Sequence, residues 1–108
     1  MIITSSENIA GKKIEKTLGL VRGNTIKAKH IGKDIMAGLR NIVGGEIKEY
    51  TEAFNEARDT VIERMTKEAE EMNADAIISI RFTTSQIMSG AAELMVYGTA
   101  VKLSEKNE

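Results

Sequence analysis

One apolar stripe constrains this chain more than any other feature of its 108 residues. Between residues 47 and 72, apolar side chains recur at steps of three or four, and mainly charged residues fill the positions between them. That spacing places the apolar side chains on one face of a helix and leaves the opposite face to solvent. Asn73 follows the stripe, where a residue of left-handed conformation often ends a helix. The sequence therefore predicts a long amphipathic helix over residues 47–72, whose buried face holds Ile47, Tyr50, Phe54, Ala57, Val61, Met65, Ala69 and Met72.

Two strands are expected to follow this helix. Residues 76–83 are rich in β-branched and aromatic side chains, which favour strands. Residues 93–103 show the same preference and predict a second strand. A linker over residues 85–92, which contains a glycine, is expected to join the two.

The faces of these strands indicate what covers the sheet. Ile78, Ile80 and Phe82 are expected on one face of the first strand. In the second strand both faces carry apolar or small residues, whereas a sheet face that is open to water is usually polar. One helix covers only one face, so we expect another copy of the chain to cover the face that holds Met95, Tyr97, Thr99 and Val101.

The N-terminal part of the chain predicts smaller elements. A strand is expected over residues 17–28, whose glycines indicate bends or close backbone approaches, and a short edge strand over residues 1–4. Apolar side chains at helical spacing predict a short helix within residues 31–42. The expected fold class is α+β, with one long helix packed on a small antiparallel sheet. A single βαββ domain over residues 1–103 precedes a polar tail over residues 104–108.

Missing residue types exclude several classes of protein. The chain has no cysteine and no proline. Without cysteine there is no disulfide framework, no thiolate metal site and no cysteine nucleophile. The first residues lack the basic and apolar regions of a leader, and no stretch reaches the roughly 18 apolar residues that a membrane span needs. The cytoplasm is therefore the expected compartment, with no membrane partner.

Charge is balanced overall but divided unevenly along the chain. Residues 1–45 hold eight basic and three acidic residues, whereas residues 46–108 hold seven and thirteen. The basic residues are spread out and no aromatic residue lies among them, so they form no platform on which bases stack. Nucleic acid is therefore not an expected partner, and the acidic half is explained by the solvated face of a long helix.

His30 is the sole histidine and the first candidate metal ligand. Asp34 lies four residues later, on the same face of the expected short helix. Two ligands make a weak site, because zinc usually takes four. A histidine at the surface or at a subunit interface is the simpler explanation.

A glycine-rich segment enters the long helix at Gly44, Gly45 and Glu46. Free backbone N–H groups at such a start can hold an anion. The P-loop pattern is missing, however, and the carboxylate of Glu46 favours the helix dipole while repelling a phosphate. A glycine hinge that joins two helices at a sharp angle is the simpler explanation of the segment.

Carboxylates at the ends of the expected elements are the candidates for acid–base work. Asp34, Glu46, Asp75 and Glu93 occupy such positions, and each is also explained as a cap or turn residue. Glu93 is the least usual, because glutamate is uncommon in strands, and a structural ion pair with Arg81 across the two strands would account for it.

Several separated motifs occur in an order that resembles a known family. These are His30–Ile35, Gly38–Ile47, Tyr50–Thr51, Glu56–Arg58, Ala74–Ala76 and Tyr97–Val101. Together they resemble the YbjQ-type family of small bacterial and archaeal proteins, over about residues 2–103. Asn73 departs from the glycine common at that place in the family, although both residues tolerate a left-handed helix cap.

The resemblance implies a dodecin-like βαββ subunit that assembles into ring-shaped homopentamers. The family also carries a heavy-metal-binding label, which fits poorly with a chain of one histidine and no cysteine. It supplies no catalytic or ligand residues to transfer to this chain.

Three functions from different classes stay open. The first, which we favour, is a homo-oligomer that binds a small ligand or partner at its subunit interfaces. The second is a protein that binds or senses a metal ion through His30, Asp34 and Glu46, repeated around a ring, and a metal ion is the cofactor that this alternative implies. The third is an enzyme that uses Asp34, Arg40 and Glu46 at an interface. The expected ligand-binding residues are His30, Lys33, Asp34, Arg40, Gly44, Gly45 and Glu46.

Overall fold

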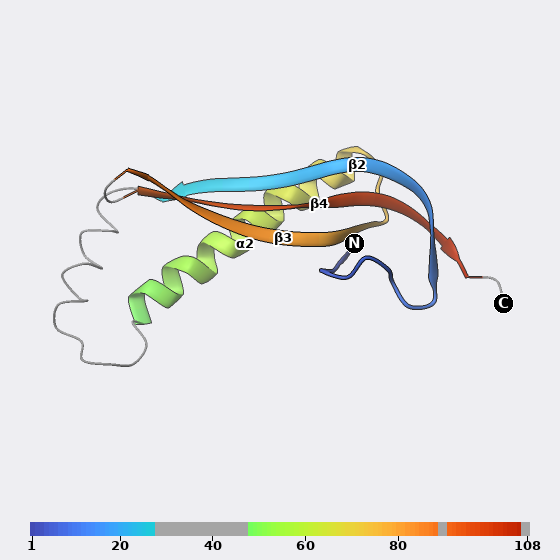
Figure 1. Cartoon of the computed structure of the whole chain (residues 1–108), viewed down its shortest axis with the longest axis horizontal. Helices are drawn as coiled ribbons and strands as arrows, with labels where there is room; N and C mark the ends of the chain where they lie inside the picture. The colour runs from blue at the N-terminus through green and yellow to red at the C-terminus, as the bar shows by residue number, and fades with distance from the viewer. Residues whose placement is uncertain (28–47, 89–90, 107–108) are drawn as a thin grey trace.

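A computed structural model describes residues 1–27, 48–88 and 91–106 of the chain (Figure 1). Over these residues one helix packs on one face of a four-stranded sheet. The elements are β1 (Ile2–Ile3), β2 (Lys12–Lys27), α2 (Lys48–Glu71), β3 (Ala76–Met88) and β4 (Ala91–Glu105). The expected α+β class is confirmed. The expected short helix within residues 31–42 lies outside the described residues.

The strand order in the sheet is β1-β3-β4-β2. β4 pairs antiparallel with both β2 and β3, whereas β1 pairs parallel with β3. The expectation of a wholly antiparallel sheet was therefore wrong, and the sheet is mixed. The reason is the connection over residues 4–11, which takes the chain from one edge of the sheet to the opposite edge, where β2 runs in the same direction as β1.

The long helix was predicted to within one residue at each end. Ala57, Val61, Met65 and Ala69 are at most 1% exposed and form its buried face. Asn73 has the positive φ of 59° that the end of the helix requires. The Ala74 N–H donates to the Ala69 carbonyl at 3.1 Å, and the Asn73 N–H donates to the Glu70 carbonyl at 3.0 Å, the paired bonds of a Schellman cap.

The strands extend further than the residues suggested. β3 continues to Met88 and β4 begins at Ala91, so most of the expected linker over residues 85–92 belongs to a hairpin. β2 begins at Lys12, whose ammonium pairs with the carboxylate of Glu105 at the end of β4. Part of the expected tail therefore belongs to the sheet.

A bulge in β3 changes which side chains share a face. Ser79 has a positive φ of 55°, and the register with β4 shifts between Ile78 and Arg81. Ile77 and Ile80 consequently both pack in the core beneath α2, while Ile78 belongs to a different cluster. The expectation that Ile78, Ile80 and Phe82 lie on one face was wrong for Ile78, because a bulge interrupts the alternation.

Two apolar clusters hold the layers together. The larger lies between α2 and the sheet and includes Val21, Met65, Ile77 and Val96, all fully buried. The smaller lies on the opposite face, where the partly buried Ile9, Ile14 and Leu103 pack against three buried side chains. Those three are Ala76, Ile78 and Val101. The segment before β2 thus covers one end of the sheet face that α2 leaves open.

Gly23 of β2 is the point of closest approach between helix and sheet. A Cβ atom there would lie 2.0 Å from the Val61 carbonyl oxygen and 2.7 Å from the Met65 backbone nitrogen. Both obstacles are backbone atoms, which cannot turn aside as a side chain can. The close backbone approach expected from the glycines of this strand is therefore confirmed at Gly23.

Gly23→Ala should destabilise the protein, because the added methyl forces the whole helix away from the sheet. Overpacking of this kind costs about 3 kcal/mol, and we expect the urea midpoint to fall accordingly. Thr25→Ala, on the same face of the same strand, serves as the control because it removes atoms without displacing α2. Equal midpoints for Gly23→Ala and the wild type would contradict the close crossing.

Candidate functional site

All the ligand residues predicted from sequence fall in one segment. His30, Lys33, Asp34, Arg40, Gly44, Gly45 and Glu46 lie within residues 28–47, outside the part of the chain that the structure describes. Their roles stay predictions. The chain leaves β2 and enters α2 at the same end of the molecule as the β3–β4 hairpin (Figure 1).

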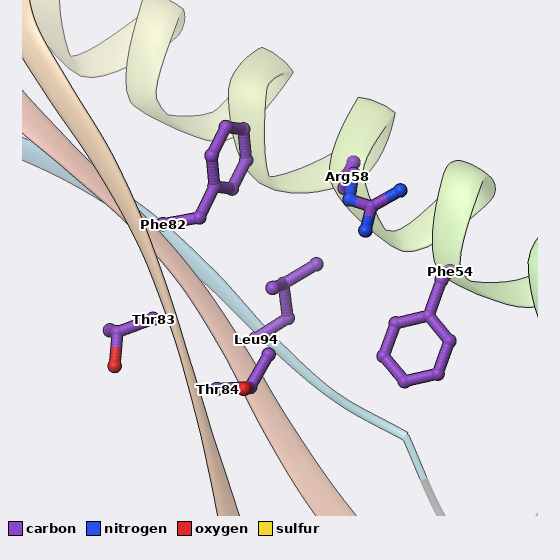
Figure 2. A pocket seen from close by; sticks show the side chains of 6 residues that line it. All are labelled: Phe54, Arg58, Phe82, Thr83, Thr84 and Leu94. Carbon is purple, nitrogen blue, oxygen red and sulfur yellow. The ribbon is translucent and has the colours of Figure 1, made fainter. Parts of the chain in front are cut away.

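A pocket of about 390 Å³ lies between α2 and the strands near this end. We call it the wedge pocket. Figure 2 shows Phe54 and Arg58 on the helix facing side chains of the sheet across it. Its described lining residues are Phe54, Arg58, Phe82, Thr83, Thr84 and Leu94.

Arg58 supplies the positive charge of the wedge pocket. Its guanidinium donates a hydrogen bond to the Asn55 side-chain oxygen at 3.2 Å. Among the residues that the structure describes, no carboxylate forms an ion pair with it. Sequence reasoning missed this pocket because it assigned Phe54 and Phe82 to the core. The only signal was the spacing of Phe54 and Arg58, one helical turn apart.

The sheet face opposite α2, which we call the open face, exposes apolar side chains. Leu20 is 62% exposed, Ile26 is 55% exposed and Tyr97 is 37% exposed. Arg22 and Arg81 lie opposite Tyr97 on the two strands that flank β4, so a basic row crosses this face. The open face therefore has the apolar composition that was predicted for a covered surface.

Glu93 of β4 and Arg81 of β3 have other hydrogen-bond partners than the ones predicted. The Glu93 carboxylate accepts a hydrogen bond from the Asn24 side-chain nitrogen at 3.2 Å. The Arg81 guanidinium donates instead to the carbonyl oxygens of Ser5 and Ile80. The expected Arg81–Glu93 ion pair was therefore wrong, because the register places Arg81 opposite Tyr97, four residues along β4 from Glu93, which lies opposite Ser85.

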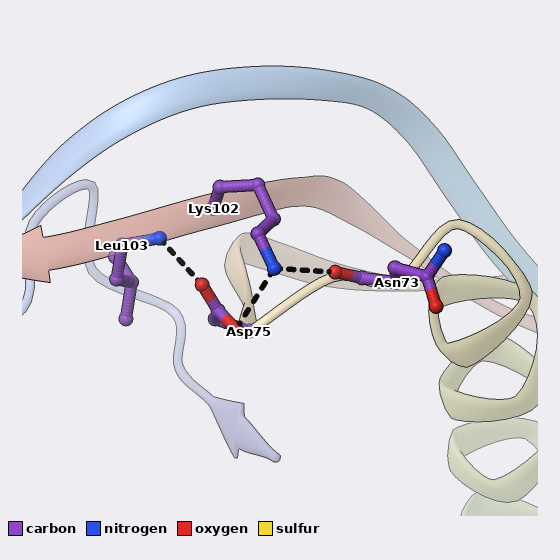
Figure 3. Close-up of polar contacts among 4 residues, drawn as sticks. All are labelled: Asn73, Asp75, Lys102 and Leu103. Atoms are coloured by element: carbon purple, nitrogen blue, oxygen red, sulfur yellow. Dashed lines mark hydrogen bonds and ion pairs between the residues drawn. The ribbon is translucent and has the colours of Figure 1, made fainter.

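Asp75 holds the turn after α2 against β4 (Figure 3). Its carboxylate accepts a hydrogen bond from the Leu103 N–H at 2.8 Å and lies 3.3 Å from the Lys102 ammonium. That ammonium also donates to the Asn73 carbonyl at 3.0 Å, which ties the helix cap to the same strand. These contacts support the structural explanation of Asp75 over an acid–base role.

The same contacts change the acidity of Asp75. The Leu103 N–H bond, assisted by the hydrogen bond and charge of Lys102, lowers the pKa of Asp75 below its ordinary value against a smaller opposing effect of desolvation. A carboxylate that is more acidic in the folded protein stabilises the fold while it is ionised.

The described residues offer neither a cluster of metal ligands nor an apolar helix long enough for a membrane. Among them, no group of three or more His, Cys, Asp and Glu side chains is placed to hold a metal ion. Likewise, α2, the helix that the structure describes, is not apolar enough to cross a membrane.

Comparison with known proteins identifies the family. Residues 1–104 match the YbjQ family, whose description is "Putative heavy-metal-binding". The chain belongs to this family. A UPF0145 protein from Methanosarcina acetivorans is 57% identical over 98% of this chain and 100% of its own length. A UPF0145 protein from Dehalococcoides mccartyi is 63% identical over 94% of this chain and 97% of its own length.

A solved structure shares the fold of this YbjQ chain. It is a protein with unknown function of the DUF74 family from Pediococcus pentosaceus, with a TM-score of 0.64 and 18% sequence identity. The match covers 96% of this chain and 98% of that one. The arrangement of helix and sheet is therefore shared at low sequence identity.

Asp75→Asn should change how stability depends on pH. Because the pKa of Asp75 is lower in the folded state, its stabilising effect is full above about pH 5 and is lost as the pH falls through the folded pKa. The urea midpoint of the wild type should exceed that of Asp75→Asn at neutral pH, and the difference should shrink towards pH 3. Asp59→Asn, which removes an exposed carboxylate from α2, is the control and should show no such convergence. A gap that stays constant from pH 7 to pH 3 would contradict the assignment.

Proposed function

We propose that this YbjQ-family chain works as a ring-shaped homopentamer that binds a small ligand or partner at its subunit interfaces. The observation that carries the proposal is the open face, where Leu20, Ile26 and Tyr97 are exposed in a single chain. Apolar side chains gathered on one sheet face favour association with another protein surface. The number of copies rests on the resemblance to dodecin-like subunits.

The charges of the chain support a head-to-tail contact between copies. Arg22 and Arg81 put positive charge on the open face, beside Tyr97. The solvent side of α2 is acidic, with exposed carboxylates at Glu52, Glu56, Asp59, Glu63, Glu70 and Glu71. An open face of one copy against the helix of the next would pair opposite charges, and such heterologous contacts close into rings.

Leu20→Glu should dissociate the assembly, because it removes apolar contact and places a negative charge against an acidic helix. Sedimentation velocity at micromolar concentration should show the wild type as an oligomer and Leu20→Glu as a smaller species. The side chain of Leu20 is 62% exposed in the single chain, so the subunit fold should survive. Met88→Glu adds the same charge at the end of β3, at an apolar side chain that is also 62% exposed, and should sediment like the wild type. A stable wild-type monomer would overturn the proposal.

Metal-ion binding is a second candidate function, favoured by the description of the family. The described residues do not fit a metal, since no cluster of three ligands occurs among them. His30 and Asp34 are the proposed ligands, and copies of the pair from neighbouring subunits would be needed to complete a coordination sphere.

Calorimetry with zinc, copper and nickel tests the metal candidate directly. A saturable heat that is abolished by His30→Ala, and kept by the Asp59→Asn control, would support it. A titration of the wild type with no saturable heat for any of the three ions would remove the candidate.

A further inference from the structure

The wedge pocket arises from the angle between the helix and the sheet. α2 touches β2 at Gly23, near the middle of the helix, and its N-terminal turns lie away from the strands (Figure 1). The space left between them is about 390 Å³, within the range of small-molecule sites. The described lining comes from α2, β3 and β4.

Apolar side chains form the floor and two sides of this space. Phe82 lies on the helix side of the sheet, opposite Val96, yet it is 43% exposed because α2 does not cover it there. Leu94, which is 5% exposed, lies between Phe82 and Phe54 in Figure 2. Two phenyl rings on either side of a leucine suit a flat ring, which they can contact by face or by edge.

Polar groups at the wedge pocket favour a ligand that carries a negative charge. The Arg58 guanidinium has more N–H donors than its one hydrogen bond to Asn55 uses, and no carboxylate pairs with it among the described side chains. Thr84 adds a hydroxyl on the helix side of the sheet, opposite Leu94. A guanidinium binds carboxylate, sulfonate or phosphate oxygens through paired hydrogen bonds.

We propose that the wedge pocket binds a planar aromatic anion. The ring of the ligand lies over Leu94 between Phe54 and Phe82, and its acidic group accepts hydrogen bonds from Arg58. Its lining residues differ from the exposed residues of the open face, so the dye titrations below test this proposal apart from the test of assembly.

Two dyes test separately what the negative charge and the aromatic rings of a ligand contribute to binding. 8-Anilinonaphthalene-1-sulfonate is an aromatic anion, and N-phenyl-1-naphthylamine has the same rings without the sulfonate. Fluorescence titration of the full chain should give saturable binding of the sulfonate dye. Arg58→Gln should lower the affinity for the sulfonate dye about tenfold, because one charge-assisted contact is lost. The affinity for the neutral dye should change by less than twofold.

Two further variants locate the site. Phe82→Leu should lower the affinity for both dyes, because it removes contact with the ring and leaves the charge of Arg58 in place. Lys106→Gln is the control, since Lys106 is an exposed cation beyond the end of β4, and it should not change the affinity for either dye. Sedimentation of every variant under the same conditions separates a loss of binding from a loss of assembly.

Backbone amide shifts in an NMR titration show where the sulfonate dye lies. The proposal expects shifts at residues 54, 58, 82–84 and 94. Shifts centred instead on Leu20 and Tyr97 would overturn it, as would equal affinity of Arg58→Gln and the wild type for the sulfonate dye. Binding that never saturates would overturn it as well.

Discussion

The crossing of α2 over β2 at Gly23 determines where every other part of the molecule lies. At that point the helix backbone meets the strand with no side chain between them, so helix and sheet lie closer there than a Cβ atom on the strand would allow. The helix is about 36 Å long, while β2 spans about 50 Å. A straight helix crossing a long strand at a fixed point must leave part of the sheet uncovered. The buried face of Ala57, Val61, Met65 and Ala69 is centred on this crossing, and the wedge pocket opens where the two layers diverge.

Because the fold has two layers, α2 and the sheet, one face of the sheet has no helix packed on it. The segment before β2 covers part of it through Ile9, which belongs to the same cluster as Ile14 of β2 and Leu103 of β4. Beyond that cluster, Leu20 and Tyr97 are exposed although they belong to the middle of long strands. A third layer is therefore needed to bury them, and within a chain of 108 residues the described part supplies none. The same constraint that positions the helix thus leaves the open face available for another copy.

A feature of the fold could be predicted from the sequence when its physical cause lies within a short stretch of the chain. The helix was predictable because its period and its cap at Asn73 are both local. The assignment of Val96 and Tyr97 to opposite faces of β4 was predictable for the same reason, because alternation needs no partner. The bulge was not, because a positive φ at Ser79 has no signature in a serine. The extent of β3 was not either, since residues 81–88 are all exposed and carry no pattern of burial. The wedge pocket depends on the tilt of one element against another, which spacing along the chain does not record.

The open face and the wedge pocket lie on opposite sides of the sheet, so they can bind different partners. Tyr97 and its flanking arginines face away from α2, whereas Phe82 and Leu94 face toward it. A second copy seated on the open face of a subunit therefore does not reach Phe82 or Leu94 of that subunit. Phe82 and Tyr97 are both partly exposed aromatic residues, but the register of β3 with β4 assigns them to different neighbours. Assembly would bury Tyr97 and leave Phe82 to a ligand, so a homo-oligomer of this chain would present one wedge pocket for each subunit.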